Sequence, residues 1–265
     1  MNPRFSASRP GSLLHFLVLL PLLLASCATG KGAVDFGSLD VMYANAYIQG
    51  PAERLPPDRL DKKKKELTKA KDLYLKGDRT LSTELERRFP GLGAAIASDA
   101  AAPLLGKAVR GDVPLLYWES AALMSAFALD PLDVSLSVRV KEARALMARA
   151  YDLDPDYGKG SLDEFYISFY GSLPGYLGGD KARAKFHFDE AIRKSGGGSV
   201  SAYVSYAMAI CVPAQDYKEW KRLIDAALAV DLGKFPDRKL ANGFARKKAL
   251  WLLSRKDDLF LSTEE

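Results

Sequence analysis

The sequence predicts an all-α protein, and three observations lead to this prediction. Apolar residues recur at spacings of three and four after residue 35, for example Leu136, Val140, Ala143, Met147 and Ala150, which is the period of an amphipathic helix. No segment shows sustained alternation bounded by hairpin turn signals, as a strand would. A similar helix ending recurs along the chain. We therefore expect helices throughout and no sheet.

Residues 1–26 have the pattern of a secretory signal peptide. Arg4 and Arg9 precede the apolar run 13–24, and the first acidic residue is Asp35. A basic start, a short apolar stretch and small residues at its end are the three parts of such a signal. His15 and Pro21 interrupt the run, which is too short to cross a bilayer, because a spanning helix needs about 20 apolar residues.

The signal ends in Leu24-Ala25-Ser26-Cys27, which resembles the lipobox of bacterial lipoproteins. In that motif the chain is cut before the cysteine, which becomes the lipidated first residue. We expect a lipid on Cys27, a flexible tether over residues 27–35 and a single domain over residues 36–265. The alternative is an ordinary signal that has a cysteine near its end by chance.

The helices of the domain follow from the apolar stripes and from their start and stop signals. Asp180 and Ser199 are expected N-caps, Ser161 with Glu164 forms an expected capping box, and Pro236 can open the last helix. Helices are expected at 58–76, 78–89, 92–109, 114–129, 133–152, 161–173, 180–195, 199–211, 215–231 and 236–255, with a further one at 35–48.

A weak internal repeat suggests how these helices pack. Similar helix ends occur at 150–155, 191–196 and 227–232, with offsets of 41 and 36 residues. These offsets exceed the tetratricopeptide (TPR) period of about 34 residues but accommodate it with longer loops. Small residues such as Ala143, Ala184 and Ala191 allow close helix pairing. The sequence therefore predicts antiparallel helix pairs stacked as a degenerate TPR-like solenoid, whose concave side is a binding surface.

The charge pattern argues against nucleic-acid binding. The formal net charge is +5, and it falls to +3 when Arg4 and Arg9 leave with the signal. A nucleic-acid binder would show lysines and arginines clustered on one face. The one dense basic run, Lys62 to Lys65, begins a helical pattern beside acidic residues. It is interpreted as a solvated helix face, and the alternative is contact with anionic lipid head groups.

Few side chains can support catalysis or metal binding. Cys211 lies in an apolar stretch and is expected in the core, and His187 is the only histidine left after signal cleavage. A multi-histidine zinc site is thereby excluded, whereas a Ser-His-Asp triad is not. We expect His187 to be a partly buried, hydrogen-bonded structural residue. No glycine-rich phosphate loop follows a strand-like run. We expect no catalytic residue, metal or cofactor.

Aromatic residues are clustered. On one expected helix Phe165 and Phe169 share a face, as do Tyr166 and Tyr170, because residues four apart are neighbours on a helix. Two aromatic faces exceed what a one-sided core needs, so one pair could line a groove or pore. The alternative is that both faces pack against other helices. The candidates for a ligand passage are Tyr117, Trp118, Phe165, Phe169, Tyr203 and Tyr206.

Several blocks, in order, resemble the T-component (TatT) family of TRAP transporters, lipoproteins with cryptic TPR repeats. The blocks cover nearly all of the chain after the signal. They are Ala70 to Gly77, Val113 to Trp118, Ala150 to Tyr157, Leu173 to Asp180 followed by His187 and Phe188, Leu240 to Asn242, and Asp257 to Phe260.

The resemblance implies a non-enzymatic protein of the bacterial cell envelope, lipid-anchored to a membrane and facing the periplasm. It implies a homotrimer that docks a periplasmic solute-binding protein, the P-component, and helps pass a small, possibly hydrophobic ligand through a pore in each protomer. The membrane contact would be through the lipid anchor only. The alternatives are a generic periplasmic TPR scaffold lipoprotein and an enzyme that uses carboxylates. The sequence does not distinguish anchoring in the inner membrane from anchoring in the outer membrane.

Overall fold

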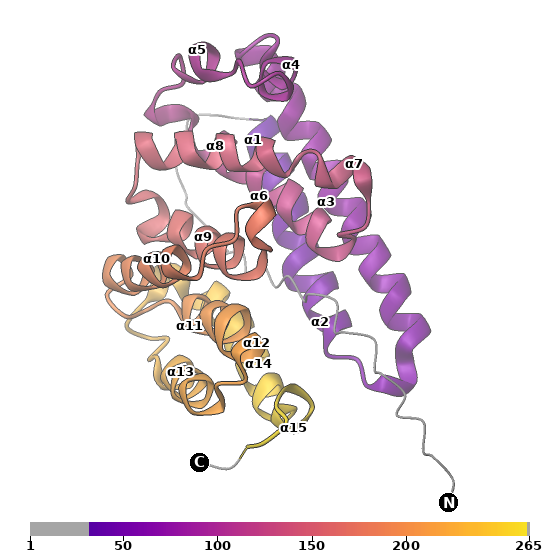
Figure 1. The fold of residues 1–265 in the computed structure, drawn as a ribbon, viewed down its shortest axis with the longest axis vertical. Coiled ribbons are helices and arrows are strands. Elements are labelled where there is room, and N and C mark those ends of the chain that lie inside the picture. Colours follow the sequence, from indigo (N-terminus) through magenta and orange to yellow (C-terminus); the bar gives the residue numbers. More distant parts are fainter. Residues whose placement is uncertain (1–31, 264–265) are drawn as a thin grey trace, which may run out of the picture.

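The computed structural model describes residues 32–263, and within this range all regular structure is helical, with no strand (Figure 1). The all-α prediction is therefore confirmed. The α-helices are α1 Ala33–Tyr43, α2 Gly50–Glu53, α3 Leu60–Arg88, α4 Leu92–Ala97, α5 Ala102–Leu105, α6 Val113–Leu129, α7 Val134–Ser137, α8 Val140–Leu153, α9 Ser161–Ser172, α10 Lys181–Lys194, α11 Val200–Tyr206, α12 Val212–Ala214, α13 Tyr217–Ala229, α14 Lys239–Leu253 and α15 Lys256–Leu259.

Shorter elements continue or join these helices. Two π-helical segments, Ala44–Gln49 and Ala207–Cys211, continue α1 into α2 and α11 into α12. Turns of 3-10 helix lie between longer helices, at Pro57–Arg59, Arg110–Asp112, Tyr157–Lys159, Gly175–Leu177 and Pro236–Arg238. The first helix starts at Ala33, so it begins inside the range 27–35 that was predicted as a tether.

The helix α3 runs unbroken through Gly77, where two separate helices, 78–89 after 58–76, were predicted. Gly77 is needed for close packing rather than as a helix stop. A Cβ atom on Gly77 would lie 2.9 Å from the carbonyl oxygen of Gly37, and a Cβ on Gly37 would lie 2.5 Å from Cγ of Leu81. The two glycines therefore allow α1 and α3 to approach more closely than larger residues would.

The prediction of one continuous helix over 92–109 is wrong, because the chain forms two short helices, α4 and α5, in this range. Asp99 has a φ of 58°, in the left-handed region that an α-helix does not use. Similarly, the predicted helix 133–152 is divided into α7 and α8. The remaining predicted helices match observed elements to within a few residues at each end.

Two of the three expected caps are confirmed. Asp180 accepts hydrogen bonds from the backbone N–H groups of Ala182 and Arg183 (2.9 and 3.1 Å), and Ser199 accepts one from Ala202 (3.1 Å). The capping box at Ser161 is wrong. Gly160, with a φ of 101°, is the N-cap of α9, and Glu164 is instead held by buried partners described below.

The hydrophobic core is built around α6 and α9. Every residue of α6 from Leu115 to Phe127 is buried, and so is every residue of α9 from Ser161 to Phe169. Both helices are therefore enclosed by others (Figure 1). Ala143, Ala184 and Ala191 have no exposed surface, as expected for close helix contacts. The TPR-like stacking of helix pairs stays a prediction.

The two ends of the domain are joined by a buried ion pair. Lys248 of α14 contacts the carboxylate of Glu53 in α2, and its ammonium lies 4.7 Å from the ring centroid of Trp251. Burial lowers the pKa of Lys248 although Glu53 opposes this shift. Gln49 donates to Glu53 (2.8 Å) and accepts from Tyr74 (2.6 Å), so α14, α2 and α3 share one polar network.

Candidate functional site

The six aromatic candidates for a ligand passage lie mainly in the interior. Tyr117, Trp118, Phe165 and Phe169 are between 0 and 5% exposed and belong to the core formed by the N-terminal half of the domain. Tyr203 and Tyr206 pack with Phe188 in the C-terminal half, at ring centroid distances of 5.8 and 4.6 Å. The structure therefore places four candidates in one large core cluster, as two separate ring pairs on α6 and α9, and the other two in a second cluster.

The two aromatic faces of α9 form as predicted. The rings of Phe165 and Phe169 stack at 5.9 Å, and those of Tyr166 and Tyr170 stack at 5.2 Å. His187 of α10 lies against the second face, with its ring 4.6 Å from that of Tyr166. The aromatic layer therefore extends from α9 to α10.

His187 is buried and hydrogen-bonded, as expected, and it belongs to a polar network that the sequence did not reveal. Its Nδ1 lies 2.8 Å from Oδ1 of Asp163, which also accepts from the hydroxyl of Tyr151 (3.0 Å). Lys194 donates to the second oxygen of Asp163 (2.8 Å). Burial is the largest single influence and lowers the pKa of Lys194, but Asp163 and Tyr151 together outweigh it, so the pKa is raised. Asp163 is thus surrounded by three donors.

The adjacent residue, Glu164, is the centre of a second network. Its carboxylate accepts from Arg238 (2.8 Å), from Ser199 (2.7 Å) and from Ser201. Arg238 is 4% exposed. Arg238 also donates to the carbonyl oxygens of Gly158 (2.8 Å) and Lys159 (2.7 Å). This network links α9 to α11 and to the start of α14.

Tyr117 differs from its neighbours because its buried hydroxyl has no hydrogen-bond partner among the described residues. Burial raises the pKa of Tyr117 well above its usual value, and Tyr157 and Glu164 add to the shift. A buried hydroxyl without a partner costs free energy. The hydroxyl of Ser205 is in the same condition.

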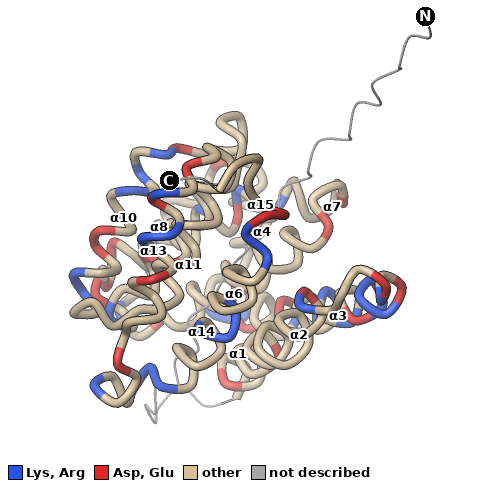
Figure 2. Tube along the Cα trace, turned by 90° about the horizontal axis from the view of Figure 1, so that it is seen from below, with Lys and Arg blue, Asp and Glu red and all other residues tan. Residues whose placement is uncertain are grey.

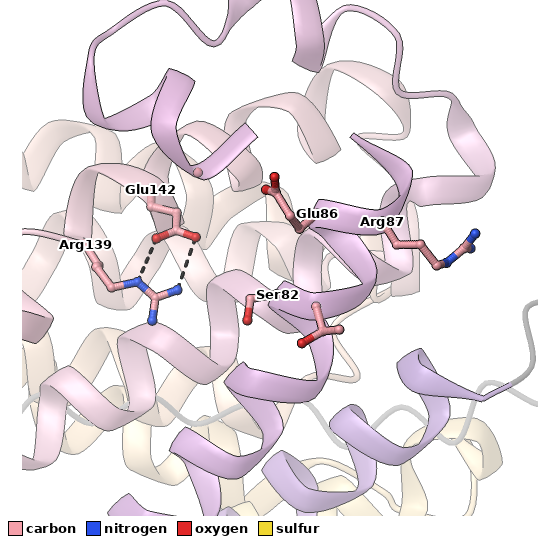
Figure 3. Close-up of a pocket in the computed structure, with 7 residues that line it drawn as sticks. Ser82, Glu86, Arg87, Arg139 and Glu142 are labelled. Atoms are coloured by element: carbon pink, nitrogen blue, oxygen red, sulfur yellow. Dashed lines mark hydrogen bonds and ion pairs between the residues drawn. The ribbon is translucent and has the colours of Figure 1, made fainter. Parts of the chain in front are cut away.

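A pocket of about 640 Å³ lies elsewhere, on the outer surface. It is lined by Ser82, Thr83, Glu86, Arg87, Gly93, Arg139 and Glu142 (Figure 3), and none of the six aromatic candidates contributes to it. Arg139 is paired with Glu142 (2.8 Å) and Asp78 (2.8 Å), and Arg87 is paired with Glu84 (2.7 Å). Both arginines of this pocket therefore already have carboxylate partners within the chain.

Behind this pocket lies a buried acid. Glu119 of α6 has no exposed surface and lies 3.4 Å from Arg139. Burial raises the pKa of Glu119 well above its usual value, and the nearby Asp78 raises it further.

The sequence contained signals for some of these polar residues. Glu119 is the only charged residue of α6, and Asp163 and Glu164 are the only charged residues of α9. A carboxylate inside an apolar helix needs a buried partner, so these positions could have been recognised. Arg238 and Lys248 stand in a basic segment, where nothing distinguishes a buried cation from an exposed one.

Other predictions concern the cysteines, metals and membrane spans. Cys211 is buried, as predicted, and its pKa is raised to about 12 by burial and by the nearby Asp216 and Glu219. Cys27 lies outside the described residues. Within residues 32–263 no three His, Cys, Asp or Glu side chains are grouped to hold a metal ion. None of the helices in that range has the length and apolarity to cross a membrane.

The fold and its interior define an all-helical protein whose buried charges are held in ion pairs within an aromatic core. The chain belongs to the TRAP transporter T-component family, which matches it over residues 17–260. It is also 33% identical, over 228 residues, to an uncharacterized protein of Treponema pallidum (strain Nichols); the match covers 85% of this chain and 71% of that relative. The resemblance found in the sequence is therefore confirmed, and the family supports an accessory role in TRAP transport. The T-component family is not a known class of enzymes.

Proposed function

We propose that the protein is a lipid-anchored periplasmic accessory subunit that docks a solute-binding protein and helps pass a small, hydrophobic ligand. The observation that carries the proposal is membership of the T-component family over nearly the whole chain. The lipobox-like residues Leu24 to Cys27 support the anchor. In this proposal the protomers form a homotrimer.

The docking step is tested by affinity purification of the native lipoprotein, followed by mass spectrometry of proteins and extracted small molecules. We expect a periplasmic solute-binding protein in the purified material, and size-exclusion chromatography with light scattering should give the mass of a trimer. If envelope proteins but no solute-binding protein are recovered, the protein is better described as a general periplasmic scaffold.

The anchor is tested by metabolic labelling with palmitate. Wild-type protein should be labelled and should partition into the detergent phase, whereas Cys27→Ala should do neither. Cys211→Ala is the matched control, because it removes the other cysteine and should leave labelling unchanged. Equal labelling of wild type and Cys27→Ala would show that the lipobox interpretation is wrong.

The passage is proposed to run along Tyr117, Trp118, Phe165 and Phe169 and to continue toward Tyr203 and Tyr206. The partnerless hydroxyl of Tyr117 would orient the polar end of a ligand, while the aromatic rings supply apolar contact area. Ligand contact and core packing can be separated by a change that removes only this hydroxyl.

Tyr117→Phe should leave the free energy of unfolding unchanged or raise it, because a buried hydroxyl without a partner is removed. The amount of co-purified ligand should fall while the solute-binding protein still binds. Tyr74→Phe is the control: it removes a buried hydroxyl that donates to Gln49 (2.6 Å), so it should destabilise by about 1 kcal/mol and leave ligand retention intact. Unchanged ligand retention in Tyr117→Phe would remove Tyr117 from the passage.

A further inference from the structure

An exposed apolar stripe runs along the first helix. Phe36, Leu39, Tyr43 and Tyr47 are 68, 53, 55 and 54% exposed. Their spacings of three and four place them on one side of the continuous helix formed by α1 and the π-helical segment after it. Scattered apolar residues are normal on a protein surface, but a contiguous set marks a contact surface.

The stripe continues onto α14. The rings of Tyr43 and Tyr47 stack at 5.3 Å, and Tyr47 meets the ring of Phe244 edge to face at 5.2 Å. Leu240, one turn before Phe244, is 43% exposed. We name these six residues the α1–α14 face: Phe36, Leu39, Tyr43, Tyr47, Leu240 and Phe244.

The margin of the α1–α14 face is basic. Lys239 and Lys247 are exposed on α14, and the ammonium of Lys247 lies 5.6 Å from the ring centroid of Phe244. Of the nearby acids, Asp40 is paired with Lys76 (3.1 Å), whereas Asp35 is exposed at the first turn of α1. Figure 2 shows α1 and α2 with few charged residues beside the basic residues of α14. Aromatic residues beside lysines are typical of surfaces that lie in a membrane interface.

The position of the face along the chain favours a membrane over other partners. Phe36 follows Cys27 by nine residues, which reach at most about 30 Å when fully extended. A lipid on Cys27 would therefore hold the near end of the face close to the bilayer. The lysines at its margin complement anionic lipids, whereas in a twofold contact of this face with itself they would meet charges of like sign.

We propose that the α1–α14 face lies on the phospholipid bilayer, with its aromatic rings among the head groups and Lys239 and Lys247 against lipid phosphates. This inference rests on the lipid anchor of the proposed function, and it adds a direct contact to the predicted anchor-only attachment. The contact fixes the orientation of the domain, because α8 and α10 lie away from the edge that α1 and α14 form in Figure 2.

The test uses the mature lipoprotein in vesicles of phosphatidylcholine and phosphatidylglycerol with nitroxide-labelled lipid. An environment-sensitive fluorophore is attached at Tyr43→Cys or, as the control, at Leu132→Cys, whose native side chain is 77% exposed between α6 and α7. With Cys27 blocked by the proposed lipid and Cys211 buried, the new cysteine is the one that reacts. We expect at least twofold stronger lipid quenching at position 43 than at position 132, and a weaker effect when Lys239→Glu and Lys247→Glu are added.

Equal quenching at positions 43 and 132, in protein that floats with the vesicles, would overturn the inference and leave the anchor intact. Protein that does not float with the vesicles would overturn the anchor and the inference with it. A position 43 that is shielded from water but not quenched, in an oligomer that Tyr43→Ser dissociates, would assign the face to contact between copies and would also overturn the inference.

Discussion

The buried pair of Glu164 and Arg238 should be energetically coupled, and a double-mutant cycle measures this coupling. Glu164→Gln removes the carboxylate and leaves the charge of Arg238, which is 4% exposed, without compensation. Arg238→Met leaves the carboxylate without its cation and deprives the carbonyl groups of Gly158 and Lys159 of a donor. Removing one partner of a buried pair costs about 3–5 kcal/mol. The double variant removes both charges, so it should cost about 2–3 kcal/mol less than the sum of the two single changes.

The assay is urea unfolding followed by far-ultraviolet circular dichroism, with the slope of the transition compared between variants. Lys185→Gln is the surface control: its partner Asp189 lies 2.7 Å away, but both side chains are about half exposed, so the cost should be below about 1 kcal/mol. Single and double changes that add to within about 0.5 kcal/mol would refute the coupling. So would single changes no more costly than the surface control.

Three further predictions concern stability and reactivity. Burial raises the folded-state pKa of Glu119 above 4.5, so the unfolding free energy of the wild-type protein should fall as the pH rises above that value, by up to about 1.4 kcal/mol per pH unit. The unfolding free energy of Glu119→Gln should not fall in this way. If urea unfolding from pH 5 to 8 gives wild type and Glu119→Gln the same pH dependence, the prediction is wrong. Cys211 should resist a thiol-specific maleimide in folded protein and react within minutes in 6 M guanidinium, since its pKa is about 12 and it is buried; rapid labelling of native protein would contradict its placement. Ala143→Leu and Ala191→Leu, at positions without exposed surface, should each destabilise by about 1–3 kcal/mol through overpacking, and thermal melts that match wild type would argue against close helix contacts there.

The helical architecture was predictable because apolar periodicity is a local property. The stripe of α8, the caps Asp180 and Ser199, and the burial of Cys211 all followed from neighbouring residues. Gly77 was wrongly predicted to separate two helices, because the contact that requires a glycine there comes from a distant part of the chain. Only the approach of α1 explains why a glycine stands in the middle of α3.

The buried polar networks were harder to predict from the sequence, because their partners are also far apart in the chain. Glu164 was assigned to a capping box because Ser161 stands three residues before it, the spacing of that motif. Its true donors, Ser199, Ser201 and Arg238, come from 35, 37 and 74 residues further along the chain. The sequence placed the aromatic candidates on their helices. Whether these side chains line a passage or pack in the core depends on which other helices lie against them, and residue spacing within one helix does not reveal this.

The ion pair between Glu53 and Lys248 affects how the chain reaches its native state. The two residues are 195 positions apart, so an interval separates the point at which Glu53 is free to fold from the point at which Lys248 is. During that interval α2 exists without the cation that neutralises its carboxylate, and Met42 and Ala46 lack their cover of Ala241 and Phe244. The first helices of the domain are thus completed by one of the last, so their packing depends on contact between the two ends of the chain rather than on sequence neighbours alone.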